Sequence, residues 1–202
     1  MFQPRMKVRL GFMGRARQAQ AVQEQETLLA LQGELSRTQE ALYQLQRPFK
    51  EEVLELLRPW AAQYTETLMR YKFLILRGGS QSGKSTLAKN LHRIFGWKPP
   101  FVQVVQDAVA ADLKDFKRDQ HGLIIFDNIN SMSFVMSQRA LIQANDSIHT
   151  LGQSATGIYS YNVWLHQIPI VGTVDHSAEW DSTDVWMREN MCLVDLRGPC
   201  FT

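Results

Sequence analysis

The chain has 202 residues, a length that suits one domain of ordinary size with an appended segment. No apolar run approaches the roughly 18 residues of a membrane helix, so we expect no membrane partner. Two cysteines cannot form a disulfide framework, which predicts reduced thiols in an intracellular protein of the nucleus, the cytoplasm or, after import, an organelle.

The first segment, residues 1–14, is a basic tail with scattered apolar residues and no clear period. Residues 1–20 hold five Lys and Arg side chains and no acid, whereas residues 119–187 hold seven acids and one arginine. A basic start on an acidic body is typical of a nucleic-acid arm, a targeting sequence or a solvated tail. The composition leaves these three interpretations open.

Residues 15–70 are expected to be helical. Five leucines occupy heptad positions there, and Pro48 should end this first helix: Leu28, Leu31, Leu35, Leu42 and Leu45. A second helix follows, which Pro59 can bend or divide, with the apolar stripe Val53, Leu56, Leu57 and Trp60. The pattern fits a coiled coil or oligomerisation segment, and equally a helical hairpin packed on the following domain.

Residues 71–202 alternate short apolar runs with longer polar or helical stretches. The runs are 73–76, 101–105, 122–126, 168–172 and 191–196, and none alternates strictly. Short aliphatic runs of this kind are typical of strands buried on both faces of a parallel sheet. We therefore expect an α/β domain, a P-loop NTPase three-layer sandwich with a mainly parallel five-stranded sheet.

A glycine-rich pattern follows the first of these runs. The segment reads Gly78-Gly79-Ser80-Gln81-Ser82-Gly83-Lys84-Ser85-Thr86 and contains the full G-x-x-x-x-G-K-[ST] motif before an expected helix, 86–95. Glycines let backbone N–H groups approach phosphate oxygens, and the dipole of the helix favours the same negative charge. Lys84 can reach the β- and γ-phosphates, and the Ser85 hydroxyl can ligate Mg²⁺. The motif predicts a site for ATP or a related nucleoside triphosphate with Mg²⁺.

A carboxylate should end a later buried strand and meet the magnesium shell. Asp127 follows the apolar residues 123–126, so we expect Ser85 and Asp127 to form the metal site. The next residue is Asn128, where hydrolytic P-loop enzymes of this type usually carry a second acid. An amide can orient a water molecule but cannot take its proton, so slow hydrolysis is one expectation.

From residue 72 to residue 196 the order of features resembles the superfamily 3 helicase domain of geminivirus and circovirus replication-associated proteins. Residues 74–78 lead into the glycine-rich motif, and residues 122–129 carry the acid. Residues 151–157 fall at the place of the family's B′ loop, 168–173 at its motif C strand, and 186–190 before its last strand.

This resemblance implies ATP-driven unwinding of DNA or RNA by a hexameric ring of identical subunits, with single-stranded nucleic acid as an expected partner. It implies that Thr173 or Asp175 replaces the family's phosphate-sensing asparagine, and that Arg188, with Arg197 as second candidate, acts as an arginine finger on a neighbouring subunit. The expected catalytic set is Lys84, Asp127, Asn128, Thr173 and Arg188.

Two departures leave the function open. Residues 140–187 contain no Lys or Arg, so the expected B′ loop lacks the charge that neutralises nucleic-acid phosphates. The family's nicking domain is also missing, since no histidine precedes His92. The sequence is thus compatible with an ATPase of helicase ancestry, and with a hydrolysis-poor nucleotide-binding module that serves oligomerisation or interaction.

Overall fold

The computed structural model describes residues 20, 23–28, 30–31, 33–34, 48–105, 110–152, 160–178 and 184–202. The chain divides into two compact units, Met1–Gln46 and Arg47–Thr202. In the first unit the described residues are helical and exposed, Leu28 and Leu31 among them. The basic tail and the other heptad leucines lie outside the described residues, so the coiled coil stays a prediction.

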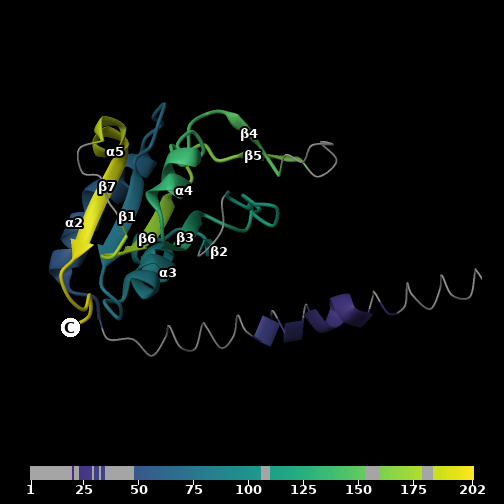
Figure 1. The fold of residues 1–202 in the computed structure, drawn as a ribbon, viewed down its shortest axis with the longest axis horizontal. Coiled ribbons are helices and arrows are strands. Elements are labelled where there is room, and N and C mark those ends of the chain that lie inside the picture. The colour runs from purple at the N-terminus through teal and green to yellow at the C-terminus, as the bar shows by residue number, and fades with distance from the viewer. Residues whose placement is uncertain are drawn as a thin grey trace, which may run out of the picture. The chain divides into compact units, whose positions relative to one another are not determined.

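Five parallel strands form the sheet of the second unit, in the order β2-β3-β6-β1-β7 (Figure 1). They are β1 (Phe73–Gly78), β2 (Pro100–Val104), β3 (Leu123–Ile129), β6 (Ile170–Asp175) and β7 (Met191–Leu196). Each strand pairs in parallel with its neighbours, which confirms the mainly parallel five-stranded sheet expected from the apolar runs. The middle strands β3, β6 and β1 are buried over nearly their whole length.

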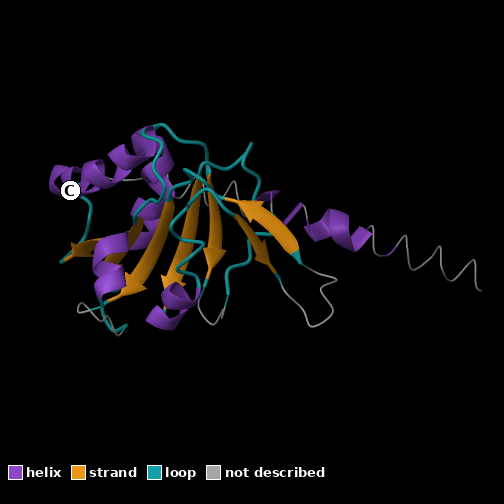
Figure 2. Cartoon of the chain, turned by 90° about the horizontal axis from the view of Figure 1, so that it is seen from above, coloured by secondary structure: helices purple, strands orange, loops and turns teal. Residues whose placement is uncertain are grey.

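Helices cover both faces of this sheet (Figure 2). The helices α2 (Glu51–Ala62) and α3 (Lys84–Phe95) lie on one face, and α4 (Met132–Ser137) and α5 (Val185–Asn190) lie on the other. Right-handed crossovers account for the division, because the connection from β1 to β2 runs toward one edge and that from β6 to β7 toward the other. The second unit is thus an α/β structure in three layers.

Helix α2 continues through Pro59, which was expected to bend or divide it. Proline removes the N–H that would bond the carbonyl of Glu55, but both residues are exposed, so water can satisfy that carbonyl. The buried side of the helix carries Leu57, Trp60 and Ala61. The Trp60 indole N–H donates to the carbonyl oxygen of Lys72 at 2.7 Å, which fixes the helix beside the start of β1.

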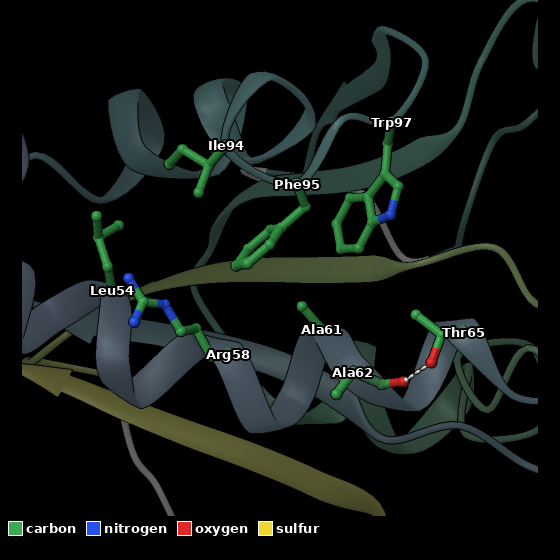
Figure 3. Close-up of a pocket in the computed structure, with 8 residues that line it drawn as sticks. All are labelled: Leu54, Arg58, Ala61, Ala62, Thr65, Ile94, Phe95 and Trp97. Atoms are coloured by element: carbon green, nitrogen blue, oxygen red, sulfur yellow. Dashed lines mark hydrogen bonds between the residues drawn. The ribbon is translucent and has the colours of Figure 1, made fainter.

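A pocket of about 380 Å³ lies between α2 and the end of α3 (Figure 3). Its lining is mainly apolar: Leu54, Arg58, Ala61, Ala62, Thr65, Ile94, Phe95 and Trp97. The Arg58 guanidinium binds two carboxylates of its own helix, those of Glu51 and Glu55. Since α3 begins at Lys84, this pocket lies at the far end of the helix from the glycine-rich motif.

The structure adds elements that the apolar runs do not reveal. An antiparallel hairpin, β4 (Ile148–Leu151) and β5 (Tyr161–Trp164), stands apart from the main sheet, and a short 3₁₀ helix, η1 (Gln63–Thr65), follows α2. The expected strand 168–172 is shifted, since β6 begins at Ile170. Ile168 instead closes a turn by donating its N–H to the carbonyl of Leu165 at 2.9 Å, and Pro169 has no N–H to offer.

Candidate nucleotide site

The sequence-predicted site residues meet at one edge of the sheet. Because β1, β3 and β6 are parallel, their carboxyl ends lie side by side. Gly78 ends β1, Asp127 lies near the end of β3, and Asp175 ends β6 directly beside Gly78. The helix α3 starts at the same edge, so its N-terminal dipole and the strand ends converge there.

The glycine-rich loop, residues 79–83, connects β1 to α3 and requires left-handed backbone at two positions. Gln81 has φ of 63° and Gly83 has φ of 90°. A Cβ atom at Gly83 would lie 2.5 Å from the Cys200 sulfur and 2.7 Å from the Phe201 ring, so a side chain would be both strained and crowded. The motif therefore needs a glycine at this position for steric reasons alone.

Residues 200–202 lie against the glycine-rich loop and contact it at Ser82 and Gly83. The N–H of Cys200 donates to the carbonyl of Ser82 at 2.9 Å, and the Cys200 carbonyl accepts from the N–H of Lys50 at 2.9 Å. The Phe201 ring stacks on Phe49 with ring centroids 5.2 Å apart. Burial raises the pKa of the Cys200 thiol to about 11, so this residue serves as a packed neutral group.

The Lys84 side chain folds over the loop. Its ammonium donates to the carbonyl oxygens of Gly78 and Gly79 at 2.6 and 2.7 Å. It also lies 3.6 Å from a carboxylate oxygen of Asp175. These contacts hold the positive charge at the mouth of the loop, next to the first turn of α3.

Ser85 and Asp127 come together as the sequence predicts for a magnesium site. The Ser85 hydroxyl donates to Asp127 Oδ1 at 2.6 Å. The same oxygen accepts from the Thr173 hydroxyl at 2.7 Å, and Lys89 Nζ lies 3.6 Å from Asp127 Oδ2. Asp127 is therefore a buried carboxylate with three partners. One of them, Lys89, was not predicted from the sequence.

Asn128 sits on an irregularity of β3, where the register with β6 shifts between Phe126 and Ile129. Its φ is 63°, and its N–H donates to the Thr173 hydroxyl at 2.8 Å. Bulges of this kind redirect a side chain at the end of a strand, and the Asn128 side chain is exposed at this edge. Thr173 thus fixes Asp127 through one hydrogen bond and Asn128 through another.

The Asp175 carboxylate is held by the turn that follows β6. Its Oδ1 accepts from the N–H and from the hydroxyl of Ser177, both at 3.0 Å. These two hydrogen bonds, with a further contribution from Lys84, lower the pKa of the Asp175 carboxyl, so the group is ionised at neutral pH.

A pocket of about 330 Å³ opens beside the glycine-rich loop. Its lining combines the loop with residues at or just after the ends of β6 and β7: Gly79, Ser80, Gln81, Ser82, His176, Leu196, Arg197, Gly198 and Pro199. His176 is hydrogen-bonded to the Asp195 carboxylate at 2.8 Å. The sequence did not identify His176 as a site residue, because only its position just after a strand end indicates it. Arg197 was predicted, as the second candidate for the arginine finger.

Arg188 is not brought to this site within one chain. It lies in α5, just before β7, and Met191 at the start of β7 pairs with Phe73 at the start of β1. At about 3.3 Å per residue, β1 separates that edge from Gly78 by about 16 Å. Arg188 is therefore at the opposite edge of the sheet from the glycine-rich loop.

The hairpin β4–β5 carries an aromatic surface with a cation from elsewhere in the chain. The Arg118 guanidinium lies 4.2 Å from the centroid of the Trp164 ring, and His166 stacks on the same ring. Trp164 is 44% exposed. Arg118 thus supplies here a positive charge that residues 140–187 lack, and no sequence pattern predicts this contact. Residues 153–157 of the expected B′ loop lie outside the described residues.

The donors at Ser85 and Asp127 fit a magnesium ion. Both are oxygen ligands, and Mg²⁺ in phosphate sites is commonly held by one or two protein oxygens together with water and phosphate. In the described part of the chain, no group of three or more His, Cys, Asp or Glu side chains is arranged for a metal. A phosphate-assisted magnesium site does not need such a group.

No protein-family model matches this chain, and comparison with curated proteins finds no match either. No helix among the described residues has both the length and the apolar character needed to cross a membrane. The resemblance to superfamily 3 helicases stays a prediction, and the functional argument depends on the geometry at the carboxyl edge of the sheet.

Proposed function

We propose that this protein binds ATP, or a related nucleoside triphosphate, as its Mg²⁺ complex and hydrolyses it at the carboxyl edge of the sheet. One observation carries the proposal: the glycine-rich loop leads into α3 with Lys84 over the loop and Ser85 hydrogen-bonded to Asp127. Backbone N–H groups at a helix start, one ammonium and a hydroxyl–carboxylate pair are the groups that bind a magnesium–phosphate ligand.

Each residue has a task in this proposal. The loop and the N-terminal turn of α3 bind phosphate oxygens, and Lys84 exchanges its contacts with the carbonyls of Gly78 and Gly79 for the β- and γ-phosphates. Ser85 and Asp127 would hold the magnesium ion, which neutralises charge on the phosphates when it is bound. Thr173 keeps Asp127 and Asn128 in position.

The Lys84→Ala variant tests the binding site. We expect it to lower ATP affinity at least about 100-fold, because hydrogen bonds to charged groups contribute about 1.5–3 kcal/mol each. The measurement is an equilibrium titration with Mg²⁺–ATP, with circular dichroism to show that the variant is folded. Lys98→Ala is the matched control, since Lys98 is exposed and precedes β2 at the opposite edge. Unchanged affinity in Lys84→Ala would refute the site assignment.

A nucleotide-binding module with little turnover is the second candidate. Asn128 favours it because an amide cannot accept a proton, and Lys89 favours it because an ammonium near Asp127 competes with Mg²⁺ for that carboxylate. Steady-state ATP hydrolysis, measured with and without single-stranded DNA, separates the two candidates. Strong stimulation by DNA supports a motor, whereas binding without turnover supports the module.

The wider proposal is that hydrolysis drives movement on single-stranded nucleic acid within a homo-oligomer. The exposed Trp164 ring, with Arg118 and His166 against it, offers a face on which a base can stack. Arg188 lies too far from the loop of its own chain, so it can serve a phosphate only across a contact between two copies. Sedimentation of the chain with and without Mg²⁺–ATP tests whether nucleotide promotes such an assembly.

A further inference from the structure

Hydrolysis at this site needs a group that takes a proton from water, and Asp127 is poorly suited to that task. Its Oδ1 accepts hydrogen bonds from Ser85 and Thr173, and its Oδ2 faces Lys89. Its exposure is only 8%. A carboxylate that is engaged on both oxygens and covered in this way positions its neighbours better than it accepts a proton.

Asn128 is the next residue along β3 and reaches the same edge. Its backbone is fixed in left-handed geometry by the Thr173 hydroxyl, and its side chain is exposed. An amide can hold a water molecule through its oxygen and its NH₂ group, but it has no basic position at neutral pH. The proton acceptor must therefore come from another element.

Asp175 has the required position, and it differs from Asp127 in being accessible to water. It ends β6 beside Gly78, and it lies two residues after Thr173, so both side chains belong to the same face of the strand. One carboxylate oxygen is held by Ser177, while the other lies 3.6 Å from Lys84 Nζ. The side chain is 40% exposed, so water has access to it.

We propose that Asp175 is the catalytic carboxylate of this site and that Asn128 orients the water which Asp175 deprotonates. The proposal rests on the proposed nucleotide site. The water oxygen forms a bond to the γ-phosphorus as the bond from that phosphorus to the β–γ bridging oxygen breaks. The nucleoside diphosphate leaves, and the water proton passes to Asp175, which returns it to solvent.

The position of Lys84 relates the Asp175 carboxylate to the expected phosphate position. An ammonium that binds a γ-phosphate oxygen lies about 2.8 Å from it. Asp175 Oδ2 lies 3.6 Å from Lys84 Nζ while that ammonium is bonded to the carbonyls of Gly78 and Gly79, so the carboxylate borders the part of the loop where the phosphates would bind. The bulge at Asn128 brings the amide from the neighbouring strand to the same edge.

The test compares the wild-type 202-residue chain with Asp175→Asn, Asn128→Asp and the double variant that exchanges the two side chains. ATP affinity is measured by equilibrium titration, and hydrolysis by single-turnover assay with protein in excess over Mg²⁺–ATP. We expect Asp175→Asn to bind ATP as tightly as wild type or up to about tenfold more tightly, because it removes a negative charge near the phosphates. We expect its hydrolysis rate to fall by a factor of about 10²–10⁴, the usual contribution of a general base.

The double variant should recover much of the lost rate, since it returns a carboxylate to the same water from β3. Failure to recover any rate would contradict the view that the two positions face one water molecule. Three results would each overturn the proposal. The Asp175→Asn variant could hydrolyse ATP at the wild-type rate, or it could lose ATP affinity and hydrolysis rate together. The third is a wild-type protein that binds ATP without hydrolysing it. Absence of ATP binding by the wild type would instead overturn the nucleotide site itself.

Discussion

Thr173 joins the two strand ends that form the candidate site. Its hydroxyl is the donor to Asp127 and the acceptor from the N–H of Asn128, so one side chain on β6 fixes two consecutive residues of β3. The side chain is 1% exposed, which shields both hydrogen bonds from competition by water. Asn128 has φ of 63°, a conformation that asparagine tolerates better than most residues, and Thr173 stabilises it.

Replacing Thr173 with valine keeps the shape of the side chain and removes the hydroxyl. We expect Thr173→Val to lower the free energy of unfolding by about 1–3 kcal/mol, because a buried donor and a buried acceptor lose their shared partner. Urea denaturation gives the value. Thr173→Ser retains the hydroxyl, lacks the methyl group and is the control. Unchanged stability in Thr173→Val, which keeps that methyl group, would show that the two hydrogen bonds do not stabilise the fold.

At the scale of elements, α2 belongs to the folded α/β unit although it was grouped from the sequence with the helical region that precedes it. Its buried residues Leu57, Trp60 and Ala61 are part of the single hydrophobic core. Trp60 also contacts Trp97, which follows α3, with ring centroids 5.7 Å apart. The helix thus extends the core over the face of the sheet that α3 begins to cover.

Two adjacent leucines of α2 provide a matched pair for testing this packing. Leu57 is 0% exposed and Leu56 is 56% exposed. We expect Leu57→Ala to destabilise the protein by about 2–5 kcal/mol through lost burial and a cavity, and Leu56→Ala to change stability by less than about 0.5 kcal/mol. Thermal or urea unfolding measures both. Similar effects in the two variants would mean that α2 does not pack on the sheet as described.

The sheet could be predicted from the sequence because its strands are short and aliphatic, and the three middle strands are buried on both faces. The contact between Ser85 and Asp127 was predictable for the same reason, since parallel strands bring their carboxyl ends to one edge. The hairpin β4–β5 was not, because residues such as Ile148 and Trp164 are exposed and leave no apolar run. Lys89 follows Ser85 by four residues in α3, so helical spacing places both side chains on the face that meets Asp127. Arg118 lies 46 residues before Trp164 and reaches it only through the fold, so its contact could not be predicted from spacing.

At the scale of the whole molecule, the described core residues lie between Leu57 and Cys200, within the unit Arg47–Thr202. The five positive charges of residues 1–20 belong to the other unit. The core and this cluster of five basic side chains, which contains no acid, are therefore carried by different parts of the chain. Stability and electrostatic attraction to nucleic acid can then be altered separately.

Deleting residues 1–20 tests this separation. We expect the shortened protein to keep its unfolding transition and its ATP affinity, and to bind single-stranded DNA more weakly. Loss of five cations lowers the slope of log affinity against log salt by up to about 3.5 for a single strand. Fluorescence anisotropy over a salt series measures the slope.

Trp164→Ala is the contrast, since it removes a stacking surface and should reduce affinity while leaving the slope unchanged. Full DNA affinity after the deletion would contradict the assignment.

Residues 200–202 give the glycine-rich loop and the start of α2 a common neighbour. The backbone of Cys200 makes both contacts: its carbonyl accepts from the N–H of Lys50, and its N–H donates to the carbonyl of Ser82. By thermodynamic linkage, a ligand that stabilises the loop conformation in which Ser82 accepts from Cys200 stabilises the docking of this segment by the same free energy. Hydrogen exchange at the amides of Lys50 and Cys200 would then slow in proportion to ligand occupancy, although neither residue belongs to the glycine-rich loop.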